Sequence, residues 1–193
     1  MLKRKIINKL VEWKNGCSNK ALLIKGARQV GKTTIIRQFA QANYENFIEI
    51  NFEQMPTAKQ AFDGNLDART ILINLSAMGF GPLVPGKTLI FFDEIQSCPK
   101  ARTAIKFLVE DGQYDYIESG SLLGINYKEV SSFPVGFEHE LEMYPLDFEE
   151  FLWACNISED VISMLKDCYE QLRPIPDFLH KQIMERYRQY LIV

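Results

Sequence analysis

Apolar residues are spaced in two different ways along residues 3–118. Short apolar runs bounded by polar or turn residues have the length of strands. Between these runs, apolar residues recur at every third or fourth position, as they do on the buried face of a helix. The strand-like segments are 21–24, 47–52, 89–92 and 114–118, and the helical ones are 3–13, 32–40, 99–110 and a weaker pair within 54–79. This alternation predicts an α/β fold.

One of the strand-like segments is apolar throughout. Residues 89–92 are Leu-Ile-Phe-Phe, four large apolar side chains in a row. A strand of this kind is buried on both faces, as in a parallel sheet covered by helices. We therefore expect a mostly parallel sheet between two helical layers, which is a three-layer sandwich.

The pattern changes after residue 142. Asp147 is placed to cap a helix, with Glu150 at the spacing of a capping box, and Ser158 is placed to cap a second helix. A third helix is expected from Asp177. The apolar face expected for the second helix is Val161, Ile162, Leu165, Cys168 and Leu172. The sequence thus predicts one domain over 1–142 and a helical segment over 143–193, which stops in mid-pattern and is expected to continue in a longer protein.

Size, composition and charge limit the kind of protein. The chain has 193 residues, 47% of them hydrophobic, which is enough for one globular domain with some surplus. Its net charge of −3 gives no broad positive field toward nucleic acid or an anionic membrane. No apolar run approaches the ~18 residues that cross a bilayer, and a signal peptide is absent, so we expect a cytoplasmic protein without membrane contact. The four cysteines lie far apart and are expected to be reduced thiols.

The strongest candidate site follows the first strand. Residues 26–33, Gly-Ala-Arg-Gln-Val-Gly-Lys-Thr, fit the phosphate-binding pattern G-x-x-x-x-G-K-[ST] and stand between a strand and a helix, as that pattern requires. The glycines let backbone N–H groups turn inward around phosphate oxygens, and the helix N-terminus adds further donors. Lys32 is expected to reach the β- and γ-phosphates, and the Thr33 hydroxyl to bind Mg²⁺. The predicted phosphate-binding residues are Gly26, Ala27, Arg28, Gln29, Val30, Gly31, Lys32, Thr33 and Thr34.

A second segment matches the same pattern formally. Residues 81–88 are Gly-Pro-Leu-Val-Pro-Gly-Lys-Thr, but the two prolines remove N–H donors, and a strand follows instead of a helix. We interpret this segment as a turn that leads into a buried strand.

Acidic and hydroxyl side chains follow the next two strands. Asp93 and Glu94 fit either a strand end that meets solvent or, beside a phosphate loop, a site in which Asp93 holds Mg²⁺ and Glu94 orients or deprotonates the attacking water. Ser119 and Ser121 either contact the γ-phosphate or the attacking water, or form an ordinary Ser-Gly turn. The predicted catalytic residues are Lys32, Glu94, Ser119 and Ser121, and the predicted metal ligands are Thr33 and Asp93.

Four segments together resemble one family. Residues 26–33, LIFFDEIQ at 89–96, YIESGSLLG at 116–124 and MYPLDFEEFL at 143–152 are similar to AAA+-type ATPases of bacteria and archaea that carry a C-terminal domain of unknown function. The resemblance covers nearly the whole chain. The Pro-Leu-x-Phe-x-Glu-Phe segment is more specific to this group than the phosphate loop is.

The resemblance implies several features of the site. The nucleotide is expected to be ATP. The fold is expected to be that of P-loop NTPases, in which the strand that carries the Mg²⁺ ligand does not directly follow the phosphate-loop strand. A polar sensor is expected at Ser119 or Ser121. Many relatives have Gly-Arg where this chain has Gly136-Phe137, which puts an arginine finger at that place in doubt. Arg28, Arg37 and Arg102 remain open as candidates. Any nucleic-acid contact is expected only through regions that follow residue 193 in such proteins.

These features favour a Mg²⁺-dependent ATPase that uses hydrolysis to move its own C-terminal region or a protein partner. The alternative is a nucleotide-gated interaction module with little or no hydrolysis. A small-molecule kinase fits less well, because the sequence has no arginine-rich lid pattern and Asp-Glu-x-Gln suits water activation.

Overall fold

The computed structural model describes residues 2–16, 19–121 and 136–192, and the chain divides into two units. The larger unit is Ile6–Tyr144, and the smaller unit joins Met1–Lys5 to Pro145–Val193. None of the helices in the described ranges is both long enough and apolar enough to span a membrane.

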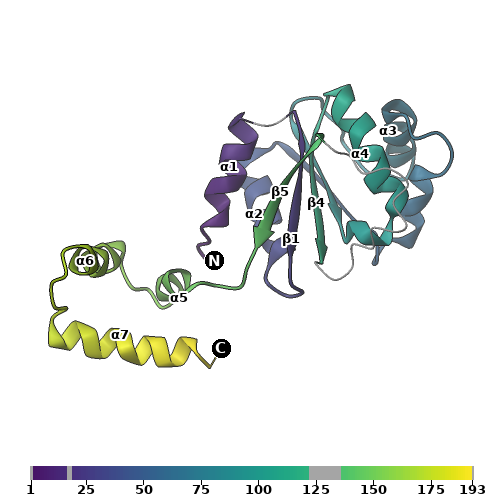
Figure 1. The fold of residues 1–193 in the computed structure, drawn as a ribbon. Helices are drawn as coiled ribbons and strands as arrows, with labels where there is room; N and C mark the ends of the chain where they lie inside the picture. The colour runs from purple at the N-terminus through teal and green to yellow at the C-terminus, as the bar shows by residue number, and fades with distance from the viewer. Residues whose placement is uncertain (1, 17–18, 122–135, 193) are drawn as a thin grey trace. The chain divides into compact units, whose positions relative to one another are not determined.

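A five-stranded sheet forms the centre of the larger unit, and every pair of neighbouring strands is parallel (Figure 1). The strands are β1 Ala21–Gly26, β2 Asn46–Asn51, β3 Thr88–Asp93, β4 Asp115–Ser121 and β5 Glu138–Met143. They lie in the order β2-β3-β4-β1-β5, so that β4 separates the strand before the phosphate loop from the apolar strand β3. Because parallel strands all end at the same edge, the residues that follow β1, β3 and β4 are brought together there.

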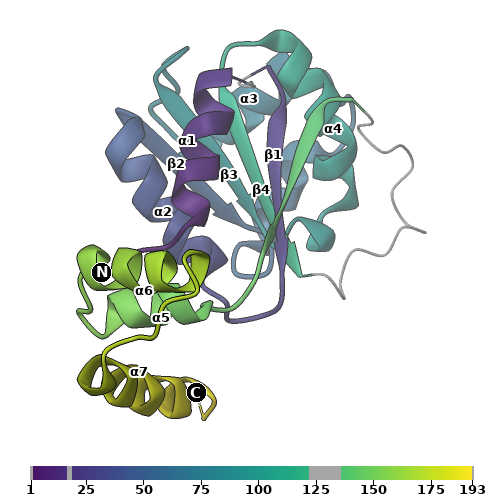
Figure 2. The ribbon, with the colours of Figure 1, turned by 60° about the vertical axis from the view of Figure 1, so that its left-hand side comes forward.

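Helices cover both faces of this sheet (Figures 1 and 2). Alternate residues of β1 point to opposite faces, so that Leu22 joins the core formed with α1 and α2, and Leu23 joins the core formed with η1, α3 and α4. The helices are α1 Ile6–Gly16, α2 Lys32–Asn43, η1 Pro56–Phe62, α3 Ala68–Ala77 and α4 Pro99–Asp111. The three-layer α/β sandwich expected from the sequence is therefore confirmed.

Strand β5 was not predicted from the sequence. It reads Glu-His-Glu-Leu-Glu-Met, and its Leu141 and Met143 pack into the core beside α1 and α2. The glutamates occupy the alternate positions, so the segment has no continuous apolar run. Its two-residue period was the signal that could have identified it.

The second match to the phosphate-binding pattern does not form a phosphate loop. The Gly86 N–H donates to the Gln113 carbonyl, and the Thr88 hydroxyl accepts from the Val84 N–H at 2.9 Å. Thr88 is then the first residue of the fully buried strand β3. The prediction of a turn that leads into a buried strand is confirmed.

The smaller unit contains α5 Phe148–Ala154, α6 Glu159–Glu170 and α7 Asp177–Tyr190. The predicted capping box opens α5, since the Asp147 carboxylate accepts from the Glu150 N–H and the Glu150 carboxylate accepts from the Asp147 N–H. Glu150 also accepts from the Lys5 N–H at 2.7 Å and pairs with Arg4 at 3.2 Å. The N-terminal residues are thereby held on α5.

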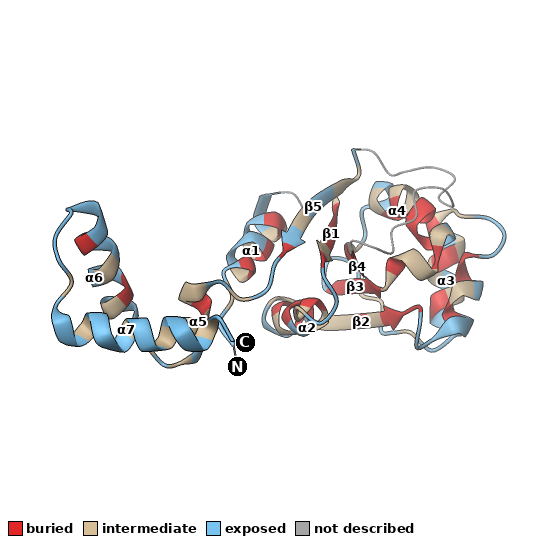
Figure 3. Ribbon diagram, turned by 60° about the horizontal axis from the view of Figure 1, so that its bottom comes forward, coloured by how far each residue is buried: buried red, intermediate tan, exposed pale blue. Residues whose placement is uncertain are grey.

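Two details of the predicted helix α6 differ from the structure. Ser158 occupies the N-cap position, but its side chain makes no capping hydrogen bond. Leu172 was expected on the buried face, but it is 90% exposed, because the helix ends before it and its φ is +51°. Ile162 and Cys168 are buried as expected. Helix α7 has no buried residue, and its surface in Figure 3 is mostly exposed.

Candidate functional site

The predicted phosphate loop connects the end of β1 to the start of α2. β1 ends at Gly26, and α2 begins at Lys32. Between them, Gln29 and Gly31 take positive φ values of 64° and 93°. Left-handed turns of this kind direct backbone N–H groups to one side and form anion-binding concavities, and the N–H groups at the start of a helix reinforce them. The backbone of the loop therefore has the conformation that the predicted phosphate-binding role requires.

Gly26 stands where no larger residue fits. A Cβ atom at this position would lie 2.4 Å from the backbone oxygen of Met143, the last residue of the neighbouring strand β5. The first glycine of the loop thus lets β1 and β5 stay paired at the point where the loop begins.

Lys32 is held over the first residues of the loop. Its ammonium nitrogen donates to the carbonyl of Gly26 at 3.0 Å and to that of Ala27 at 2.8 Å, and the residue is 7% exposed. Burial lowers the pKa of Lys32, while the negative charges of Glu94 and Asp93 act in the opposite direction. The two carboxylates therefore lie within electrostatic range of the lysine.

Asp93 is the centre of a buried hydrogen-bond network at the end of β3. The Thr33 hydroxyl donates to Asp93 Oδ2 at 3.0 Å, across 60 positions of sequence. The Ser119 hydroxyl and the Glu94 N–H donate to the other carboxylate oxygen. The structure thus brings together the predicted metal ligands Thr33 and Asp93 with the predicted sensor Ser119.

Asn51 belongs to the same network and was missed by the sequence analysis. Its side-chain nitrogen donates to Asp93 Oδ2 at 3.0 Å, because the parallel pairing of β2 with β3 sets Asn51 directly beside Asp93. The sequence offers a polar residue near the end of the predicted strand 47–52, but it does not show that Asp93 is the neighbour of this residue.

Glu94 follows Asp93 in a left-handed conformation, with φ of 53° and ψ of 51°. This backbone conformation is uncommon for a residue with a long side chain, and such residues often mark functional sites. The Gln96 side chain, in the short helix η2 Ile95–Ser97, donates to the Glu94 carboxylate. Glu94 is half-buried, in contrast to the buried Asp93 that precedes it.

The other predicted residues surround this centre. Ser121 is buried at the end of β4 and is paired in register with Gly26. Ala27, Arg28 and Gln29 are exposed on the loop, Val30 is half-buried, and Thr34 is exposed on the first turn of α2.

The residues fit a bound Mg²⁺ by the chemistry of their donors. Thr33 supplies a hydroxyl oxygen and Asp93 a carboxylate oxygen, and the hard oxygen ligands preferred by Mg²⁺ are of this kind. Within the described ranges, no group of three or more His, Cys, Asp and Glu side chains could hold a metal by itself.

Two of the three candidate arginines are engaged elsewhere. Arg102 is 3% exposed and pairs with Glu118 at 3.1 Å and with Glu138 at 2.8 Å. Burial raises the pKa of both carboxyls, and the charge of Glu138 raises that of Glu118 further. Arg37 makes two 2.6 Å hydrogen bonds to the carboxylate of Glu49.

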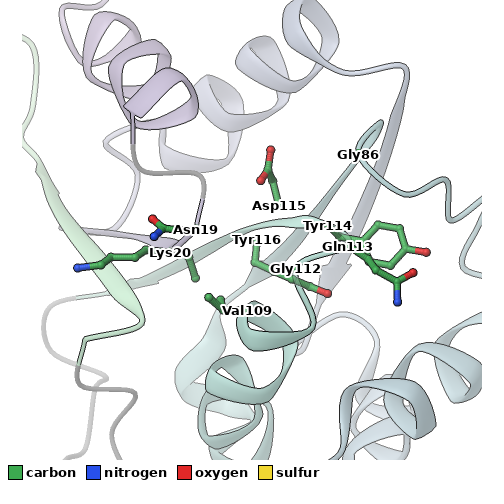
Figure 4. A pocket seen from close by; sticks show the side chains of 10 residues that line it. Asn19, Lys20, Gly86, Val109, Gly112, Gln113, Tyr114, Asp115 and Tyr116 are labelled. Atoms are coloured by element: carbon green, nitrogen blue, oxygen red, sulfur yellow. The ribbon is translucent and has the colours of Figure 1, made fainter.

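A separate hollow of about 390 Å³ lies at the opposite edge of the sheet (Figure 4). It is lined by Ala21 and Asp115, the first residues of β1 and β4, and by Gly86 of the second pattern match. None of the predicted site residues lines it. It is therefore separate from the predicted phosphate site.

Comparisons with known proteins agree with this geometry. A family described as "AAA domain" matches residues 18–152. The uncharacterized protein MJ1544 of Methanocaldococcus jannaschii is 30% identical over 151 residues, which cover 78% of this chain and 32% of that protein. The chain thus spans about a third of the length of this relative.

Among solved structures, the Aeropyrum pernix ORC1 protein in complex with DNA superposes with a TM-score of 0.51 at 15% identity, covering 85% of this chain and 54% of that one. At this identity the similarity concerns the fold alone. The family match extends over more than half of the chain and includes the phosphate loop, Asp93 and Glu94. The chain therefore belongs to the AAA domain family of P-loop ATPases.

Proposed function

We propose that this protein is a Mg²⁺-dependent ATPase whose site comprises Lys32, Thr33, Asp93 and Glu94. The observation that carries the proposal is the 3.0 Å hydrogen bond from the Thr33 hydroxyl to the Asp93 carboxylate. It joins the first turn after the phosphate loop to the acidic end of β3, and a metal bound to a triphosphate would need both groups.

The loop binds the triphosphate through its inward N–H groups and the N-terminus of α2. Lys32 exchanges its contacts with the carbonyls of Gly26 and Ala27 for contacts with the β- and γ-phosphates. Thr33 and Asp93 would hold Mg²⁺, which when bound neutralises charge on these phosphates. Asn51 and Ser119 keep the Asp93 carboxylate oriented through their hydrogen bonds to it.

Glu94 carries out the proton transfer. The oxygen of a water forms a bond to the γ-phosphorus, the bond from that phosphorus to the β–γ bridging oxygen breaks, and ADP leaves with the bonding electrons. Glu94 accepts a proton from the attacking water, and the proton then passes to solvent. Gln96 fixes the Glu94 side chain by donating a hydrogen bond to it.

Substitution of Lys32 and Glu94 tests these roles. Lys32→Ala is expected to weaken ATP binding at least ~100-fold, because the phosphates lose their buried cation. Glu94→Gln is expected to leave binding within ~3-fold and to lower turnover at least ~100-fold. Titration with a fluorescent ATP analogue measures binding, and phosphate release measures turnover.

The second pattern match provides a matched control. Lys87 occupies the same place in that pattern, but its side chain is exposed and pairs with Glu45. Lys87→Ala should behave as the wild type in both assays. Wild-type binding by Lys32→Ala would contradict the proposed site, and normal turnover by Glu94→Gln would remove Glu94 from its role.

The use of hydrolysis to move the helical unit is part of the proposal. Its support is the continuity from the phosphate loop to the end of the larger unit, since Gly26 is paired in register with Met143 and Pro145 begins the rest of the smaller unit. Single-turnover phosphate release distinguishes this ATPase from a module that binds ATP without hydrolysing it. The module would release no phosphate while binding ATP tightly.

A further inference from the structure

Four arginines lie in the larger unit, and each has a different setting. Hydrolysis of ATP develops negative charge on the γ-phosphoryl group, and an arginine that contacts it accelerates hydrolysis by ~10³–10⁵-fold in the nucleotide hydrolases that use one. The settings of Arg28, Arg37, Arg69 and Arg102 decide which of them can reach that group.

Arg37 and Arg102 are both paired with carboxylates, Arg37 at the surface and Arg102 in the interior. Arg37 makes a two-point contact with Glu49, and Arg102 is buried between Glu118 and Glu138. Moving Arg102 to a phosphate would leave two buried carboxyl groups without this cation, which is strongly unfavourable. Arg102 is therefore not available to the nucleotide. Arg37 is held by a solvent-exposed pair and lies within electrostatic range of Asp93, so it is tested beside Arg28 below.

Arg69 lies near the amino-terminal end of β4, whereas the phosphate loop follows the carboxyl-terminal end of β1. With Gln113 and Tyr114 it lines a hollow beside the start of β4, whereas Ser121 at the far end of that strand is paired with Gly26. Six residues of strand span ~20 Å, which is far beyond the reach of an arginine side chain.

Arg28 lies at the surface and close to Lys32. It is exposed, and it directly follows Ala27, whose carbonyl accepts a hydrogen bond from Lys32 Nζ at 2.8 Å. Covalent geometry then puts the Arg28 Cα within ~6 Å of the lysine nitrogen, a distance shorter than an extended arginine side chain. The positive charge of Arg28 also contributes to lowering the pKa of Lys32, after burial, so the two cations act on the same space.

We propose that Arg28 is a catalytic residue of this ATPase site, whose guanidinium contacts γ-phosphate oxygens of the ATP held by its own loop. The planar guanidinium stays charged and can form two parallel hydrogen bonds to phosphate oxygens. It stabilises the charge on the γ-phosphoryl group while the bond to the ADP oxygen breaks. The inference rests on the proposed function, and it makes the arginine part of the same chain rather than of a partner.

The test compares Arg28→Ala, Arg28→Lys and the control Arg37→Ala in the full chain with Mg²⁺. Calorimetry gives the affinities for ADP and for a non-hydrolysable ATP analogue, and phosphate release gives turnover. Arg28→Ala is expected to keep ADP affinity within ~2-fold, to lose preference for the ATP analogue, and to lower turnover at least ~100-fold. Arg28→Lys should recover only part of the lost turnover, because lysine keeps the positive charge but cannot form two parallel hydrogen bonds to phosphate oxygens. Arg37→Ala should match the wild type.

Turnover per molecule is expected to stay constant on dilution, because the arginine acts within its own chain. Unchanged turnover and unchanged nucleotide preference in Arg28→Ala would overturn the inference while leaving the ATPase intact. An equal loss of ADP and ATP-analogue affinity would also overturn it, since Arg28 would then serve binding alone. A wild-type protein that binds no nucleotide would instead refute the proposed function. If the wild type binds ATP without hydrolysing it, a lost preference for the ATP analogue in Arg28→Ala supports the inference and an unchanged preference overturns it.

Discussion

Glu118→Gln is expected to leave the larger unit at least as stable as the wild type at neutral pH, whereas Arg102→Met is expected to destabilise it strongly. The side chains of Arg102, Glu118 and Glu138 are 3%, 0% and 7% exposed, so one buried cation faces two buried carboxyl groups. The glutamine removes one of the two acidic groups and still offers an oxygen to Arg102. The methionine removes the cation and leaves both acidic groups behind.

The magnitudes follow from this difference in charge. Breaking a buried ion pair by removing one partner costs about 3–5 kcal/mol, because an uncompensated charge remains in the interior. We expect Arg102→Met to reduce the free energy of unfolding by that amount. A cluster with one cation and one carboxylate is balanced, so Glu118→Gln should lie within about 1 kcal/mol of the wild type or above it.

The pH dependence has a defined sign. Burial, and next the negative charge of Glu138, raises the pKa of Glu118 well above its ordinary value. An acid with a raised pKa in the folded state contributes stability that is fully present below its unfolded pKa of about 4.3 and is lost as the pH rises through the folded pKa. The wild type should therefore lose more stability than Glu118→Gln as the pH is raised from about 5 to about 9.

Urea unfolding followed by tryptophan fluorescence measures these differences. Trp13 is 3% exposed in the larger unit and Trp153 belongs to the smaller one, so a Trp153→Phe background isolates the larger unit. Arg37→Ala breaks an exposed pair as the control and should cost no more than about 1 kcal/mol. A loss in Glu118→Gln as large as that in Arg102→Met would refute the reasoning, as would parallel pH profiles.

Three further substitutions test other parts of the structure. Gly26→Ala would put a Cβ 2.4 Å from the Met143 oxygen, so we expect a loss of about 1–3 kcal/mol in urea unfolding and weaker ATP binding; wild-type stability would contradict the close approach. Ser119→Ala removes the hydroxyl that donates to Asp93 and should lower turnover about 10-fold or more with ADP affinity kept, and unchanged turnover would remove Ser119 from the site. Glu150→Ala removes the capping-box acceptor of α5 and should lower the free energy of unfolding by about 1–2 kcal/mol, measured by thermal unfolding with circular dichroism. Glu150→Gln should retain most of the cap, and equal losses in the two variants would assign the effect to charge alone.

The sequence predicted those parts of the site that are encoded locally. The phosphate loop needs glycines, a lysine and a threonine at fixed spacing between a strand and a helix, so a short window identifies it. The apolar strand that ends in Asp93 and Glu94 is recognisable for the same reason. The spacing of Asp147 and Glu150 likewise revealed the cap of α5.

Partners set by strand order could not be predicted in this way. Asn51 reaches Asp93 only because β2 is the neighbour of β3 in this register. The pairing of Arg102 with Glu118 and Glu138 depends on β4 and β5 lying on either side of β1. No local pattern contains this information, because the residues come from separate elements.

The pairing of Glu150 with Arg4 and the Lys5 N–H links the two ends of the chain within the smaller unit. The smaller unit takes residues from both ends of the chain, so the backbone crosses between the units twice, at Lys5–Ile6 and at Tyr144–Pro145. A fragment cut at residue 145 would lack the arginine and the amide that hold Glu150, and so the helical part cannot be excised as one continuous piece without exposing a carboxylate that is buried in the intact protein.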